Sequence, residues 1–165
     1  MALRQNGFSL VEVLVTMLIL AIGLLGLAGL QLTSLRNNTT AYERSQATLL
    51  AYSIIDRMRA NRDAAGTGAY TVALDAGPSG TNCVGVGAAC NPAAMAAYDV
   101  SQWKCELGKW TANAACAGIL GILPEGDGAI DVNGDVVTVT IQWEEKREAD
   151  SAAGKLTTLV VSTVL

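Results

Sequence analysis

The distribution of hydrophobic residues divides the chain into two unequal parts. No charged residue occurs from Val13 to Leu35, whereas the rest of the chain mixes polar, charged and apolar residues. A helix over this run is about 35 Å long, which exceeds the roughly 30 Å hydrocarbon core of a bilayer. The run therefore predicts a membrane-spanning helix. A cleaved signal peptide is disfavoured, because its hydrophobic region is usually about 7 to 15 residues long and residues 31–34 offer no small-x-small cleavage site.

Helical periodicity continues beyond the apolar run. Apolar side chains recur at spacings of three and seven, and nothing breaks the helix before Asn61. We therefore expect one helix from Phe8 to Asn61, whose outer half carries four arginines, with Arg62 adjoining, against two acidic residues. Residues 63–165 carry twelve acidic and five basic side chains, a net charge of −7. A head this acidic disfavours nucleic acid as a partner.

One carboxylate interrupts the wider apolar stretch. Glu12 stands between Val11 and Val13, next to the uncharged run. A charge near the bilayer centre costs about 2.5 to 3.5 kcal/mol, and such charges usually have a function and a partner. The simpler alternative is that Glu12 extends to the membrane surface. Its position alone does not name the partner.

The motif GFSLVE at residues 7–12 follows a six-residue stub and precedes the apolar run. It resembles the N-terminus of type IV prepilins. The resemblance implies that prepilin peptidase cuts between Gly7 and Phe8 and methylates the new amine of Phe8. It also implies an inner-membrane protein with a cytoplasmic N-terminus and a periplasmic head. The continuation AIGLLGLAGLQ, residues 21–31, is similar more narrowly to the PilV family of minor pilins, the type IV pilus modification proteins.

The resemblance suggests a partner for Glu12. Cleavage leaves an ammonium group on Phe8 in the same apolar layer, and pairing two buried charges relieves both desolvation penalties. If subunits pack with a small axial offset, the amine of one meets Glu12 of its neighbour. Three glycines later in the span, Gly23, Gly26 and Gly29, weaken the helix. They are either contact points for close packing or, as the resemblance implies, a segment that melts on entry into the filament.

Local signals predict the first part of the head. A breaker-rich link contains a short strand over Tyr70–Leu74. Asn91 followed by a proline predicts a helix start, and this helix places Trp103 in the core and ends near Gly108. Asp99 is a candidate acceptor for the Trp103 indole, although an exposed carboxylate is the simpler interpretation.

The head also contains all four cysteines: Cys83, Cys90, Cys105 and Cys116. The periplasm favours disulfides over free thiols. Of the three possible connectivities, we favour Cys83 with Cys90 and Cys105 with Cys116, because both close short loops rich in glycine and alanine. A zinc site is disfavoured because the chain contains no CxxC pair.

Residues 127–135 allow two interpretations. Asp131, Asn133 and Asp135 alternate as calcium ligands often do, but the stretch lacks the glycine and final glutamate of an EF-hand loop. Asn133-Gly134 instead predicts a two-residue hairpin between strands at 129–132 and 136–143. With a last strand at 156–164, three antiparallel strands packed on the upper half of the long helix give an α+β, pilin-like fold.

Catalysis is not expected. The chain has no histidine, which removes the residue most used for general acid–base work and metal ligation near neutral pH. No pairing of a nucleophile with a base and no phosphate-binding loop is present: Ser9 lies in the membrane motif, and its one acidic neighbour, Glu12, is already assigned to the amine. We expect no catalytic residue, no cofactor and no metal.

These patterns divide the chain into a leader peptide at 1–7, a transmembrane and assembly helix at 8–35, its amphipathic extension at 36–62 and a periplasmic head at 63–165. The resemblance implies a minor type IV pilin that helps to prime pilus assembly, with roles in twitching motility and adhesion, and that ends in the extracellular pilus near its tip. It implies as partners other minor pilins and the major pilin through the N-terminal helix, prepilin peptidase, inner-membrane lipid and a tip adhesin.

One alternative is a minor pseudopilin of a type II secretion system. Another is a membrane-anchored enzyme or binding protein with a fortuitous GFSLVE.

Overall fold

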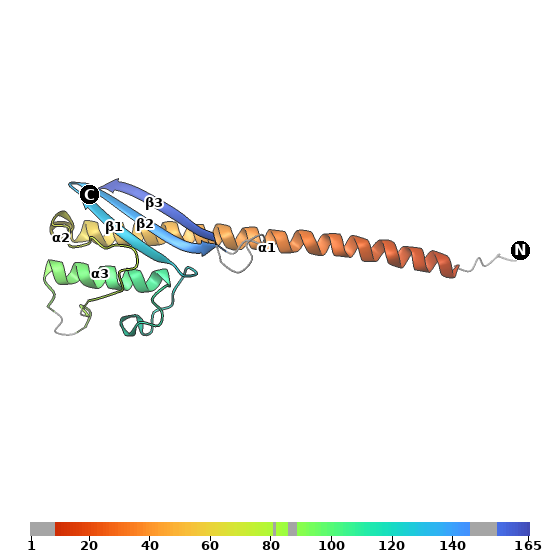
Figure 1. Ribbon diagram of the computed structural model, residues 1–165, viewed down its shortest axis with the longest axis horizontal. Helices are drawn as coiled ribbons and strands as arrows, with labels where there is room; N and C mark the ends of the chain where they lie inside the picture. The colour runs from red at the N-terminus through yellow and green to blue at the C-terminus, as the bar shows by residue number, and fades with distance from the viewer. Residues whose placement is uncertain (1–8, 81, 86–88, 146–154) are drawn as a thin grey trace, which may run out of the picture. The chain divides into compact units, whose positions relative to one another are not determined.

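The computed structural model describes residues 9–80, 82–85, 89–145 and 155–165. Its elements, in chain order, are α1 (Leu10–Ala60), α2 (Arg62–Gly66), α3 (Pro92–Leu107), the 3-10 helix η1 (Ala114–Cys116), β1 (Asp127–Asn133), β2 (Val136–Glu145) and β3 (Lys155–Val164) (Figure 1). The chain forms two compact units, Met1–Ala41 and Tyr42–Leu165, and α1 contributes to both. The expected long helix and three-stranded antiparallel sheet are confirmed, and the fold is α+β.

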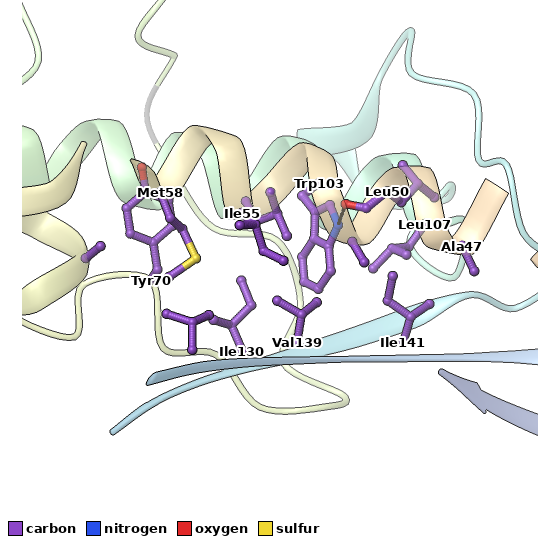
Figure 2. Packing of buried hydrophobic residues seen from close by; sticks show 14 of the residues in the cluster. Ala47, Leu50, Ile55, Met58, Tyr70, Trp103, Leu107, Ile130, Val139 and Ile141 are labelled. Carbon is purple, nitrogen blue, oxygen red and sulfur yellow. Dashed lines mark hydrogen bonds between the residues drawn. The ribbon is translucent and has the colours of Figure 1, made fainter. Parts of the chain in front are cut away.

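The core of the second unit lies between two helices and one face of the sheet (Figure 2). The later part of α1 buries one helical stripe, because its small and apolar residues recur every three or four positions. These residues are Ala47, Leu50, Ala51, Ile54, Ile55 and Met58. Strand β2 buries every second side chain, as its alternation predicted, through Val137, Val139, Ile141 and Trp143. Helix α3 adds Trp103 and Leu107.

The sheet has the order β1-β2-β3, and both pairs are antiparallel. Asn133 pairs with Val136, so Gly134 and Asp135 form the hairpin loop. The predicted loop, Asn133-Gly134, was therefore one residue early. Gly134 takes a φ of 59°, which suits the first loop position of a tight hairpin turn, where glycine avoids the strain of a side chain.

The predicted strand over Tyr70–Leu74 is wrong. Only Val72 pairs, in an isolated bridge to Ile130 that has two backbone hydrogen bonds of 2.9 and 3.0 Å. The chain then turns at Asp75, whose φ of 61° is incompatible with an extended strand. The segment thus touches the edge of β1 at one point.

Helix α3 has the boundaries that its sequence predicted. The side chain of Asn91 accepts a hydrogen bond from the backbone N–H of Ala94 at 2.8 Å, and Pro92 occupies the first helical position. Gly108 ends the helix with a φ of 122°.

Two disulfides constrain the head, and their pairing is the one that short loops favoured. Cys83 bonds to Cys90, and Cys105 bonds to Cys116. The second bond joins the buried face of α3 to η1.

Candidate assembly site

Glu12 lies in the first turn of α1. This turn is closed by its backbone N–H, which donates to the carbonyl oxygen of Ser9 at 3.0 Å. A carboxylate there faces the positive end of the helix dipole, which stabilises it modestly. The side chain is exposed, and among the described residues it has no hydrogen-bond or ion-pair partner. Gly7 and Phe8, the expected cleavage and methylation site, lie outside the described residues.

The surroundings of Glu12 are apolar and uncovered. Leu10, Val11 and Leu14 are 76%, 65% and 60% exposed. Every side chain from residue 10 to residue 39 is exposed, so no other part of the described chain covers this half of α1. By length and composition, α1 is the one described helix that can cross a membrane, with a mean hydropathy of 2.6 in its most apolar window. Such a surface needs lipid or other protein around it.

The three glycines of the span are not needed for close contacts within the described part of the chain. A Cβ atom added at Gly23, Gly26 or Gly29 would meet no heavy atom within 4 Å. Nothing inside the described unit therefore requires their small size. Close packing on another helix and local melting both stay predictions.

In the second unit, a polar network fixes the end of α1 to α3. Arg57 Nη2 donates to Glu106 Oε1 at 3.0 Å, and Arg57 Nη1 lies 4.0 Å from Asp99 Oδ1. The Tyr70 hydroxyl donates to Asp99 Oδ2 at 2.7 Å. Burial and this bond to a carboxylate raise the pKa of Tyr70 above its ordinary value. The expected roles of Asp99 were wrong: it is half-buried and binds Tyr70, and the Trp103 indole has a different acceptor.

A buried ion pair joins α3 to β1, and the sequence analysis missed it. Lys104 Nζ lies 2.7 Å from Asp127 Oδ1, and the two side chains are 0% and 6% exposed. Asp127 also accepts hydrogen bonds from the backbone N–H groups of Asp75 and Gly128. Burial alone would raise the pKa of Asp127, but these donors outweigh it and hold the pKa below its ordinary value. The available signal was the position of Lys104, three residues before the buried Leu107 on the apolar face of α3.

The sequence analysis also missed a pair of carboxylates, Glu43 and Glu145, that lies where β2 ends beside α1. Glu145 is 2% exposed, accepts a hydrogen bond from the Thr157 hydroxyl at 2.7 Å and lies 3.6 Å from Arg44 Nη2. Burial and the charge of Glu145 raise the pKa of Glu43, against the opposing effect of the Trp143 indole. The negative charges of Glu43 and Glu145 repel each other when both carboxyl groups are ionised.

The described residues contain no group of three or more metal-binding side chains. The candidate calcium residues Asp131 and Asn133 belong to the β1 strand, and Asp135 lies in the hairpin loop.

Two family models match adjoining parts of the chain. Residues 3–28 match the prokaryotic N-terminal methylation motif, and residues 29–101 match type IV pilin Tt1218. No curated protein and no solved structure gives a significant match. An exposed apolar N-terminal helix, a small antiparallel sheet and a methylation motif around Glu12 are consistent with a pilin-like fold. The chain is similar to type IV pilins over residues 29–101 and matches the prokaryotic N-terminal methylation motif over residues 3–28.

Proposed function

We propose that this chain is a minor type IV pilin that helps to prime assembly of a type IV pilus and is then incorporated into it. The observation that carries the proposal is Glu12, an exposed carboxylate on an uncovered apolar helix with no partner among the described residues. A charge in lipid is stable only when something compensates it. Because the rest of the described chain supplies nothing, the partner comes from outside it.

The partner that fits is the free amine of Phe8 in an adjacent subunit. Cleavage after Gly7 creates this ammonium group at the membrane-embedded end of the chain. Two opposite charges in a low-dielectric layer attract strongly, and their pairing removes two desolvation penalties together. Glu12 then sets the axial register between neighbours, and prepilin peptidase becomes a necessary earlier partner.

The minor role, the PilV relationship and the tip position rest on sequence resemblance. Residues 21–31 resemble the PilV family, whose members act with other minor pilins and the major pilin. The same resemblance orients the chain, with the leader 1–7 in the cytoplasm and the head in the periplasm. Two disulfides in the head support this orientation, since the periplasm permits them.

Mass spectrometry of the mature chain tests processing. We expect a protein that begins at N-methylated Phe8 when it is isolated from cells with working prepilin peptidase. An intact leader in those cells contradicts the proposal.

Deletion of the gene that encodes this chain then distinguishes a role in a pilus from a role in a secretion system. Loss of surface pili and twitching supports the pilus assignment. Secreted enzymes trapped in the periplasm, with normal pili, support a pseudopilin instead.

A further inference from the structure

A hollow of about 350 Å³ lies on the head beside α3. One face of α3 contributes Tyr98, Ser101 and Gln102, which share a face because they are three and four residues apart. Gly80 and Asn82 line it from the segment before the first disulfide, and Ala115, Ala117 and Ile119 line it from η1 and the turn that follows. Its volume is at the lower end of the range for small-molecule pockets, about 300 to 1,000 Å³.

The walls of this hollow are held in place by the fold. A Cβ atom on Gly80 would lie 2.9 Å from the carbonyl oxygen of Ala97, so only glycine allows the chain to approach α3 this closely. On the other side, the bond between Cys105 and Cys116 fixes η1 to α3. The Asn113 side chain also caps η1 by accepting from the N–H of Ala115 at 2.9 Å. A preformed site loses little entropy when it binds a ligand.

Most of the polar groups that line the hollow make no hydrogen bond within the described part of the chain. Ser101 is only 3% exposed, and its hydroxyl has no hydrogen-bond partner among the described residues. Within that part of the chain, the Tyr98 hydroxyl and the Gln102 amide also bond to nothing. Asn82 uses its Oδ1 to accept from the N–H of Val84 at 2.9 Å, which leaves its NH₂ group as a donor. These groups are therefore available to a ligand with donors and acceptors of its own.

The lining also defines the charge of that ligand. None of the described residues that line the hollow carries a charge. An anion would find no cation there and would approach a head of net charge −7, while a cation would find no carboxylate in the lining. An apolar ligand would leave the Ser101, Gln102 and Asn82 side chains unpaired. What fits is an uncharged molecule rich in hydroxyl groups, with a C–H face that can stack on the ring of Tyr98.

We propose that this hollow binds a neutral saccharide. The site would give the pilin a ligand of its own, and it is independent of the role of Glu12 in assembly. A failure of saccharide binding therefore leaves the assembly proposal untouched, and the reverse also holds.

Saturation-transfer NMR on the full chain tests the proposal. The chain is held in dodecylphosphocholine micelles, which carry no sugar headgroup, and is mixed with lactose, cellobiose or N,N′-diacetylchitobiose. We expect signal transfer to at least one of these disaccharides and weaker transfer to the anionic 3′-sialyllactose. Retention on immobilised dextran with no free-disaccharide signal would also support the site and would assign it to a polymer.

Variants link the signal to the hollow. Tyr98→Ala should weaken binding at least about tenfold, and Gln102→Ala about threefold to tenfold, the range that one neutral hydrogen bond supplies. Tyr52→Ala, at an exposed tyrosine of α1 that is not in the hollow, is the matched control and should bind as the unaltered chain does. Melting temperature and disulfide content show whether each variant is folded, and Gln102→Ala keeps the test decisive if Tyr98→Ala is not.

The proposal is overturned by either of two results. One is the absence of transfer from all three disaccharides together with no retention on dextran. The other is binding that Gln102→Ala and Tyr98→Ala leave unchanged. If these variants lower incorporation into pili while no saccharide binds, the hollow is a contact between subunits and the proposal is wrong.

Discussion

The indole Nε1 of Trp103 donates a hydrogen bond to the carbonyl oxygen of Leu50 at 3.0 Å (Figure 2). Both residues are buried, at 0% and 5% exposure, and they belong to α3 and α1. This bond joins the two helices in the middle of the apolar core, where the indole also fills the space above the sheet. Trp103 therefore contributes both apolar packing and a directional hydrogen bond to the contact between α1 and α3.

Trp103→Phe should destabilise the head by about 1 to 3 kcal/mol, because it removes the bond to Leu50 and leaves a small cavity. Urea unfolding of the full chain in micelles, followed by near-ultraviolet circular dichroism, measures the change. Trp110→Phe is the control, since Trp110 is half-buried and the hydrogen bond that its indole donates to Asp127 is long, at 3.4 Å. Equal losses in the two variants would contradict a special role for the bond to Leu50.

Asp127 should make the head sensitive to acid. Its pKa is lowered in the folded state, so the stability from its ion pair is fully present above the unfolded pKa and is lost as the pH falls through the lower folded pKa. This loss of stability begins at about pH 4, the ordinary pKa of an aspartate in an unfolded chain. Asp127→Asn should remove this part of the acid dependence.

The same variant should cost about 3 to 5 kcal/mol at pH 7, because Lys104 then stays buried without its carboxylate. Melting curves from pH 2 to pH 7 measure both effects. If stability depends on acid in the same way in Asp127→Asn, the acid sensitivity does not come from Asp127.

Glu43 should have the opposite pH dependence. Its pKa is raised in the folded state, so its stabilising contribution is present below the unfolded pKa and is lost as the pH rises through the folded value. Glu43→Gln should therefore stabilise the head at pH 7, by less than about 1 kcal/mol because the site is partly screened, and should have little effect near pH 3. Melting temperatures at the two pH values show this, with Glu144→Gln as the neighbouring control. A loss of stability at pH 7 would contradict the repulsion between Glu43 and Glu145.

Local patterns predicted the elements, and contacts between distant residues decided what the patterns could not. The stripe on α1 and the alternation of β2 were readable because each follows the period of its own backbone. The ion pair between Lys104 and Asp127 was not, since 23 residues separate partners that only the packing of α3 on β1 brings together. The bridge at Val72 replaced a predicted strand for the same reason, because pairing depends on the edge that a segment meets.

The partner of Glu12 could not be found from the sequence or from the structure of one chain. The sequence marks it clearly as a charge in an apolar stretch, and the structure leaves it exposed in the first turn of α1. Its partner cannot be found in one chain, because the proposed amine is on another subunit. Motif and chemistry predict the contact, and under this proposal it forms only between subunits of an assembled filament.

The amount of Glu12→Ala protein in sheared pili tests this central claim most directly. We expect the variant to reach the membrane fraction at normal levels, while its level in pili falls at least about tenfold, and Glu12→Asp to retain part of the signal because it keeps the charge. A normal level of Glu12→Ala in the pili would contradict the pairing of Glu12 with the amine of a neighbouring subunit.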